Sequence, residues 1–185
     1  ITINGATNVD WEAMTQDDLY LYIADIGNNK GDRKDLKIYK VDKPTFMSHN
    51  NVDCEIIEIK YSDQENFEYK DFSTPYDAEA IIAYGDNLYI FTKNWKDKVT
   101  KVYSISKNSG SYTLHEVSSY ACNFLITDAT YHIYADKIIL IGYSSHLIST
   151  QKIVILENFS ADDFFSGTIQ EIEVNANTMG FKQIE

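Results

Sequence analysis

Two acidic pairs with the same spacing, Asp10-x-Glu12 and Asp77-x-Glu79, are the residues of this chain best suited to chemistry. Carboxylates that lie close together repel one another unless they are protonated, paired with cations or bound to a metal. Such a group could ligate a hard cation such as Ca²⁺, which prefers oxygen ligands, or could serve as general acid and base.

Polar loops that follow each acidic pair could complete a site. They supply carboxylate and amide oxygens, possible countercharges and one indole ring: Asp25, Asn28, Asn29, Arg33, Lys93, Asn94 and Trp95. Carboxylates and neutral oxygens together are the ligand mixture of Ca²⁺ sites. If a metal is held, we expect Glu12, Glu79 and Asn28 to ligate it, and Asp128 and Glu185 to approach from later repeats. The cofactor prediction is therefore either none or Ca²⁺.

The same residues have an interpretation that needs no ligand. A repeated Asp can fix a turn by accepting hydrogen bonds from backbone N–H groups, and a repeated Glu can form an ion pair with Lys or Arg. No catalytic residue is assigned. The chain has no GxSxG motif, no phosphate-binding glycine loop and no dinucleotide fingerprint, and its four histidines lack metal-ligand spacing.

The acidic pairs recur because the chain is built from similar segments. Glu12, Glu79 and Thr130 align without a gap across the nine positions that follow each of them. Third and fourth strands are predicted after each aligned hairpin, at 37–41 and 55–61, at 101–105 and 112–117, and at 152–156 and 168–174. Four short strands in a repeat of about fifty residues are typical of a β-propeller blade. A β-sandwich with coincidental internal similarity is the alternative.

The predicted fold is therefore all-β, with residues 1–185 forming a single region of a β-propeller. It comprises three four-stranded blades at about 7–63, 76–120 and 121–176, with residues 1–4 and 181–185 in flanking blades. Because three blades are too few to close a ring, the complete propeller is expected to be larger, with six blades or with some of them absent here. The missing blades would come from the parent chain or from a second copy.

Irregular segments are predicted between these strands. Residues 45–53 and 62–75 are expected to be loops. Residues 160–165 are expected to form a helical turn, with Ser160 as its N-cap.

Composition narrows the range of partners. The net charge of −12 argues against nucleic acid, because phosphate binding depends on clustered Lys and Arg. No run of eighteen apolar residues occurs, so no membrane insertion is expected. Cys54 and Cys122 lie in different repeats, and the sequence leaves their redox state open.

Two stretches carry a resemblance to known proteins: DWEAM…YIADIGNNKGDR…LKIYKV and YDAEAI…LYIFTKNW…TKVYSI. They resemble β-propeller domains of secreted or surface proteins of bacteria. They are more distantly similar to the esterase-like phytase and gluconolactonase-type six-bladed propellers. The resemblance implies a secreted or cell-surface location and a channel in which Glu12 and Glu79 can hold calcium, with Asp25 and Asn28 nearby. Repeat three departs from this pattern at Thr130.

Two functions are compatible with these observations. The preferred one is a non-enzymatic binding or scaffold module of an exported bacterial protein, whose rim loops contact a protein, a peptide or a glycan. The alternative is a calcium-dependent hydrolase of phosphoester or lactone substrates, in which the metal polarises a substrate oxygen. For either function, the channel and rim residues are Asp10, Glu12, Asp25, Asn28, Asn29, Arg33, Asp77, Glu79, Lys93, Asn94 and Trp95.

Overall fold

Short strands joined by tight turns make up nearly all of the regular structure. The computed structural model describes residues 1–144 and 150–174. Its elements are β1 (Thr2–Asn4), β2 (Trp11–Gln16), β3 (Tyr20–Asp25), β4 (Lys37–Asp42), α1 (Lys43–Ser48), β5 (Asn51–Asp53), β6 (Glu55–Tyr61), β7 (Ala78–Tyr84), β8 (Asn87–Thr92), β9 (Thr100–Ser106), β10 (Gly110–Leu114), β11 (Glu116–Tyr120), β12 (Leu125–His132), β13 (Lys137–Tyr143), β14 (Gln151–Glu157) and β15 (Thr168–Val174). The all-β prediction is confirmed.

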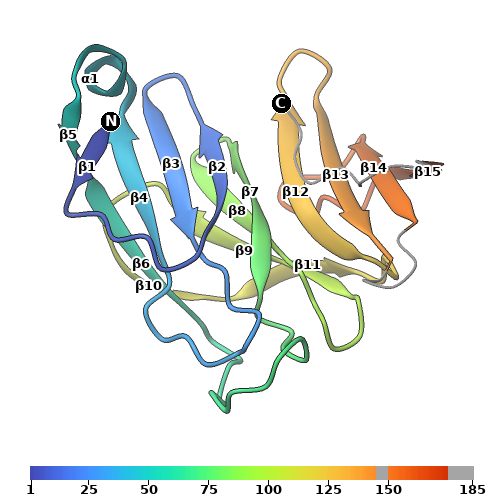
Figure 1. Cartoon of the computed structure of the whole chain (residues 1–185). Coiled ribbons are helices and arrows are strands. Elements are labelled where there is room, and N and C mark those ends of the chain that lie inside the picture. The colour runs from blue at the N-terminus through green and yellow to red at the C-terminus, as the bar shows by residue number, and fades with distance from the viewer. Residues whose placement is uncertain (145–149, 175–185) are drawn as a thin grey trace.

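The strands form four sheets (Figure 1). Sheet A is the parallel pair β1–β5, and sheet B has the order β10-β6-β4-β3-β2. Sheets C and D are antiparallel and four-stranded, with the orders β11-β9-β8-β7 and β12-β13-β14-β15. The first strands of sheets B, C and D lie side by side, because β7 packs against both β2 and β12.

Hydrophobic patterning explains why the sheets stack. The second strand of sheet C, NLYIFT, is apolar on both faces, which is the pattern of a strand covered on both sides. Leu88 and Ile90 face sheet B in one buried cluster with Tyr22 and Ile57. Tyr89 and Phe91 face sheet D in a second buried cluster, and Leu140 lies in that cluster. Sheet C is therefore the middle layer of three.

A third, smaller cluster closes the far face of sheet B. Ile23, Tyr39 and Val41 of sheet B pack there with Val52 of β5, and Phe46 of α1 lies against them. Residues 1–4 were expected to belong to a flanking blade. In the structure β1 pairs in parallel with β5 and covers sheet B.

One predicted strand divides between two sheets. The fourth strand of repeat two was expected at 112–117, but β10 leaves its own repeat and pairs in parallel with β6 of sheet B. The strand is interrupted at His115, and β11 then pairs with β9 in sheet C. Leu114 is buried in the core between sheets B and C, which holds β10 in its crossed position.

Two predicted irregular segments also differ from the structure. The expected loop at 45–53 contains most of α1 and all of β5. Asp42 caps α1 by accepting a hydrogen bond from Thr45 N (2.9 Å). The helical turn expected at 160–165 is wrong. Ala161 has a φ of +52°, which ends any right-handed turn, and Ser160 forms a single bridge with Asp163.

Candidate functional site

The two acidic pairs lie where the first strands of sheets B and C begin. Glu12 and Glu79 occupy equivalent β-bulges, because the pairing with the second strand skips one residue between Trp11 and Ala13 and again between Ala78 and Ala80. A bulge leaves its extra residue outside the ladder and redirects its side chain. This local geometry brings both glutamates toward the junction of the two sheets, where the charge of Glu79 contributes to raising the pKa of Glu12.

The equivalent bulge in sheet D corrects the alignment of the third repeat. Its skipped residue is Thr127, between Ile126 and Asp128, so Thr127 rather than Thr130 corresponds to Glu12. The gapless alignment failed because the hairpin turns differ in length, with two residues between Tyr84 and Asn87 but four between His132 and Lys137. Asp128 is consequently paired with Ile141 and is not equivalent to the acidic pairs. Glu185 lies outside the described residues.

Glu12 is a carboxyl group held in its neutral form. Burial, followed by the charges of Glu79 and Asp10, raises its pKa from an ordinary value near 4.5 to about 8. A hydrogen bond with Asp10 also favours the protonated form of Glu12. Gly27 makes this approach possible: a Cβ there would lie 2.3 Å from Asp10 Oδ2 and 2.8 Å from Glu12 Cγ.

Glu79 differs because it has a counterion. Lys93, whose side chain is 7% exposed, forms an ion pair with it. The Lys93 Nζ also lies 4.7 Å from the centroid of the Trp95 ring and 5.3 Å from that of Tyr143. Burial alone would lower the pKa of Lys93, but Glu79 outweighs it and the pKa is raised. Lys93 therefore links sheet C to sheet D as a charged lysine.

Asp77 is a structural anchor between two loops. Its carboxylate is buried and accepts hydrogen bonds from Asn28 N (2.7 Å) and Trp95 Nε1 (2.7 Å). Burial raises its pKa to about 6, although both hydrogen bonds act in the opposite direction. The predicted role of a repeated Asp in fixing backbone N–H groups applies to this residue.

Asp25 and Arg33 form the corresponding anchor in repeat one. The Asp25 carboxylate is fully buried, accepts a hydrogen bond from Asp10 N (2.8 Å) and forms an ion pair with Arg33 Nη1 (2.9 Å). Arg33 also donates to Gly27 O (2.8 Å). These contacts hold the start of β2 against the loop after β3.

The side chains of Asn28 and Asn94 form hydrogen bonds with the backbone of their own loops. Asn28 Oδ1 accepts from Arg33 N (3.0 Å), and Asn94 Oδ1 accepts from Lys96 N (3.0 Å). Asn29 contributes its carbonyl, which accepts from Phe72 N (2.9 Å). The side-chain oxygens of Asn28 and Asn94 are thus already engaged in hydrogen bonds.

Each of the expected calcium ligands already has a partner within the protein. Asn28 Oδ1 accepts a hydrogen bond from Arg33 N, Glu79 forms an ion pair with Lys93, and Glu12 forms a hydrogen bond with Asp10. Within residues 1–144 and 150–174, no group of three or more His, Cys, Asp or Glu could hold a metal ion.

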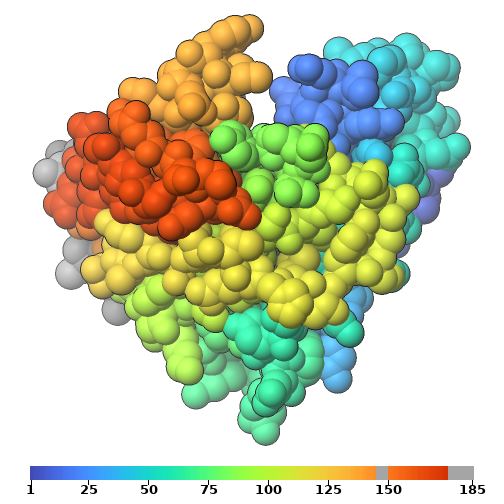
Figure 2. All heavy atoms as spheres, turned by 180° about the vertical axis from the view of Figure 1, so that it is seen from behind, coloured from blue at the N-terminus to red at the C-terminus, as the bar shows by residue number. Residues whose placement is uncertain are grey.

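A separate feature of this end of the molecule is a set of interlocked loops. We call residues 26–35, 62–75 and 93–98 the rim loops (Figures 1 and 2). Backbone hydrogen bonds join the first two, from Lys70 N to Lys30 O (3.0 Å) and from Phe72 N to Asn29 O, and the last two, from Trp95 N to Thr74 O (3.1 Å). The aromatic rings of Phe72 and Trp95 are 4.8 Å apart.

Two cavities open beside the rim loops. One of about 440 Å³ is lined by Val9, Asp10, Asn28, Asn29, Lys30, Asp32 and Arg33. The other, of about 510 Å³, is lined by Lys30, Gly31, Asp63, Glu65, Asn66, Glu68, Tyr69, Lys70, Ser73, Thr74, Pro75, Tyr76 and Lys96. The second cavity combines charges of both signs with two tyrosines.

Three residues of this region were not predicted from the sequence. Tyr143 lies over the Lys93 ammonium group, and Gly27 admits the side chain of Asp10. Thr127 is buried at the third bulge, and its hydroxyl has no hydrogen-bond partner within the described part of the chain. A repeat alignment that placed the bulges correctly would have identified Thr127.

Comparison with known proteins identifies no relative. No family model matches the chain, and no curated protein or solved structure matches it either. Among the described residues, no helix has the length and apolar character needed to cross a membrane.

Proposed function

We propose that this chain is a non-enzymatic binding module whose rim loops hold a peptide segment of a partner protein. The proposal includes the architecture: sheets B, C and D are three consecutive blades of a propeller-like stack, with β2, β7 and β12 as its inner strands. It also includes the location, outside a bacterial cell or on its surface, which rests on the resemblance of the two quoted stretches.

The observation that carries the binding role is the interlocking of the rim loops around the cavity of about 510 Å³. Loops joined by main-chain hydrogen bonds are ordered before a ligand arrives, which lowers the entropic cost of binding. The acidic groups nearby are occupied in holding these loops, since Asp77 anchors two of them and Asp25 anchors Arg33. This use of the carboxylates favours a scaffold over a catalyst.

A peptide fits this cavity better than a glycan does. Lys30, Lys70 and Lys96 face the cavity together with Glu65 and Glu68, so groups of both charges are available. A peptide supplies complementary side chains of both signs together with backbone donors and acceptors, whereas an uncharged glycan would leave the lysines and glutamates unpaired.

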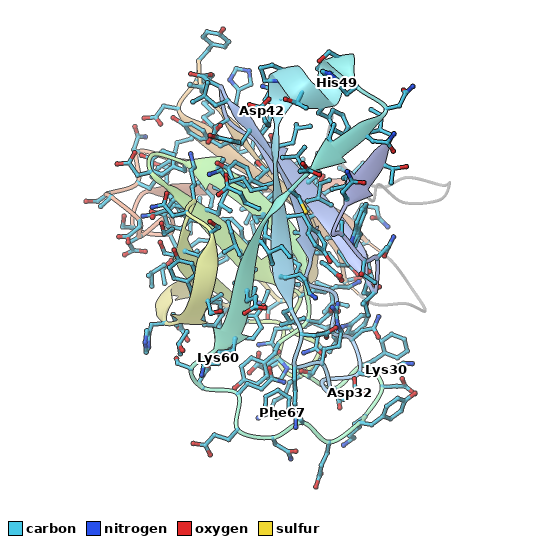
Figure 3. All side chains as sticks on the ribbon, turned by 90° about the vertical axis from the view of Figure 1, so that its left-hand side faces the viewer. Lys30, Asp32, Asp42, His49, Lys60 and Phe67 are labelled. Carbon is cyan, nitrogen blue, oxygen red and sulfur yellow. The ribbon has the colours of Figure 1, made fainter. Side chains whose placement is uncertain are left out.

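One exposed and one half-buried aromatic ring, Tyr69 and Phe67, provide the apolar part of the surface. Tyr69 is 59% exposed, with Lys30 Nζ 5.1 Å from its ring centroid, and Lys34 Nζ is 4.8 Å from the Phe67 centroid. Lys30, Asp32 and Phe67 lie together at one end of the molecule, and Asp42 lies at the opposite end (Figure 3). Aromatic residues placed in this way are typical anchors of protein–peptide contacts.

The test is a binding screen of the whole chain against peptide and glycan arrays, followed by titration calorimetry of the best peptide. Tyr69→Ala should weaken that peptide by about tenfold or more, as expected for an aromatic anchor. Tyr134→Ala is the matched control, because Tyr134 is 95% exposed in the turn between β12 and β13 at the opposite end. Glycan binding without peptide binding, or equal effects of the two variants, would contradict the proposal.

The second candidate is the calcium-dependent hydrolase, and the state of Glu12 is what favours it. A cation beside Glu12 and Asp10 would relieve the repulsion that raises the Glu12 pKa. The ion pair between Glu79 and Lys93 weighs against it. Calcium at millimolar concentration should raise the melting temperature of the wild type and not that of Glu12→Gln; without such a rise the second candidate fails.

A further inference from the structure

The acidic pair of repeat one differs from its counterpart in repeat two because it has no cation. Glu79 forms an ion pair with the ammonium group of Lys93, at the bulge equivalent to that of Glu12. Neither Asp10 nor Glu12 takes part in an ion pair within the described parts of the chain. Two carboxyl groups in contact are stabilised by a positive charge beside them, and in repeat one that charge can come from a ligand.

The loop after β3 supplies no lysine at this place. Lys93 N donates to Asp77 O (2.8 Å), and the equivalent bond of repeat one is donated by Gly27 N to Asp10 O (3.2 Å). Gly27 has no side chain, and Ile26 before it is buried in the core. A Cβ at Gly27 would lie 2.3 Å from Asp10 Oδ2, so the Asp10 carboxylate occupies the space above the glycine. Repeat one therefore keeps the acidic pair of repeat two without its internal counterion.

A cavity gives a ligand access to Asp10. The cavity of about 440 Å³ beside the rim loops is lined by two aspartates, Asp10 and Asp32, and by two cations, Lys30 and Arg33. Both cations have partners outside this cavity, since Lys30 Nζ lies 5.1 Å from the centroid of the Tyr69 ring and Arg33 forms ion pairs with two other aspartates. Among the described residues the two lining aspartates form no ion pair, so the cavity favours a positively charged group.

Arg33 adds a requirement for a hydrogen-bond acceptor. Its Nε pairs with Asp35 (3.1 Å), and its Nη1 pairs with Asp25 (2.9 Å) and donates to Gly27 O (2.8 Å). The other amino nitrogen, Nη2, is buried and has no hydrogen-bond partner in the part of the chain that the structure describes. A buried N–H donor without an acceptor is costly, so a ligand that brings an oxygen to it gains binding free energy.

A positive charge next to an acceptor oxygen is the chemistry of a peptide amino terminus, where the α-ammonium group is followed by the first carbonyl. A lysine side chain carries the ammonium group alone, and a calcium ion brings no acceptor. The ammonium group that pairs with Glu79 also favours an ammonium group over calcium at the equivalent bulge. Lys30 lines both this cavity and the larger one of about 510 Å³, so a peptide that begins at Asp10 can continue past Lys30 into the second cavity.

We propose that the cavity beside Asp10 and Arg33 binds the free amino terminus of a peptide, with its α-ammonium group on the Asp10 carboxylate and its first carbonyl oxygen on Arg33 Nη2. The inference rests on the proposed function, because it names the end of the peptide that the rim loops hold. Capture of a terminal amine is a known mode of peptide recognition. A blocked amino terminus has no charge and leaves the carboxylate unpaired, so Asp10 selects free amino termini over blocked ones.

The experiment compares peptides that differ only at the amino terminus. A peptide library is printed through its carboxyl ends in two copies, one with free and one with acetylated amino termini, and the best free peptide is titrated calorimetrically in both forms. The wild type should bind the free form about tenfold or more tightly, because acetylation removes the charge that pairs with Asp10. A third form, acetylated and with lysine as its first residue, supplies an ammonium group without an amino terminus and should bind no better than the acetylated form.

Asp10→Asn tests the assigned carboxylate. This variant should bind the free form as weakly as the wild type binds the acetylated form. Its affinity for the acetylated form should be unchanged, and that value together with the circular dichroism spectrum shows that the variant is folded. Asp18→Asn is the matched control, because Asp18 is an exposed aspartate beyond the other end of β2, and it should keep the preference for the free form.

The possible failures of the inference and of the proposed function can be told apart. Equal binding of the free and acetylated forms, a preference that survives Asp10→Asn, or tight binding of the lysine form would each overturn the amino-terminal site and leave the proposed function intact. Absence of binding on both arrays would refute the proposed function and this inference together.

Discussion

Replacing Glu12 by Gln should stabilise the protein in alkaline solution, which is an unusual outcome for a residue in the candidate site. The pKa of Glu12 is about 8 in the folded state and near 4.5 in the unfolded state. The folded state therefore favours the neutral form of Glu12. Below 4.5 both states carry the proton. Between the two values the folded state binds more protons than the unfolded state, so stability falls as pH rises and the loss is complete above about 8.

The size of the effect follows from that interval. A pKa difference of one unit corresponds to about 1.4 kcal/mol, so the full interval would correspond to about 5 kcal/mol. Glu12 is only partly buried, and solvent and salt screen the repulsion, which reduces the expected effect to about 1–2 kcal/mol. Gln resembles the protonated carboxyl group in shape and lacks the pH-dependent loss.

The assay is urea unfolding of wild type and Glu12→Gln at pH values below and above this interval. The two free energies of unfolding should agree at the acidic end, and the variant should be more stable at the alkaline end. Glu79→Gln is the matched control at the equivalent bulge. It removes the counterion of the buried Lys93 and should destabilise the protein by about 3 kcal/mol. A difference between Glu12→Gln and wild type that does not change with pH would refute the argument.

Three further substitutions test the anchoring contacts. Asp77→Ala leaves the buried Asn28 N–H and the half-buried Trp95 Nε1–H without an acceptor and should cost about 2–4 kcal/mol in urea unfolding, whereas a loss below 1 kcal/mol would contradict its role. Gly27→Ala drives a methyl group into Asp10 and should lower the melting temperature by several degrees; an unchanged value would mean that the loop yields freely. Asp42→Ala removes the cap that binds Thr45 N and should cost about 1 kcal/mol, with increased hydrogen exchange confined to α1; increased exchange throughout sheet B would be inconsistent with a local cap.

The prediction of the fold was based mainly on the periodicity of the strands. The strands β6 and β15 begin and end at the predicted residues, and burial alternates along β6 from Ile57 to Tyr61. The destination of β10 could not be predicted, since a short strand such as GSYTL has no local feature that selects one sheet over another. That choice depends on the burial of Leu114 between sheets B and C.

The sequence analysis treated Glu12 and Glu79 alike, although the two glutamates have different neighbours. Glu12 and Glu79 occupy the same bulge, but the position of Lys93 after the second strand is taken by Ile26 in repeat one. Ile26 is fully buried in the core between sheets B and C. Glu12 therefore lacks the lysine that neutralises Glu79. The binding role, the propeller architecture and the calcium alternative stay predictions.

The crossing of β10 into sheet B has a consequence for how this chain can be divided. The backbone of repeat two supplies the edge of sheet B before it completes sheet C, so a cut between the two repeats removes β10 from sheet B. Sheets B and C should respond to a pulling force or to a protease as one unit, and shuffling of single repeats during evolution would have to retain both. Sheet D, formed entirely from consecutive strands, is the part that could be exchanged alone.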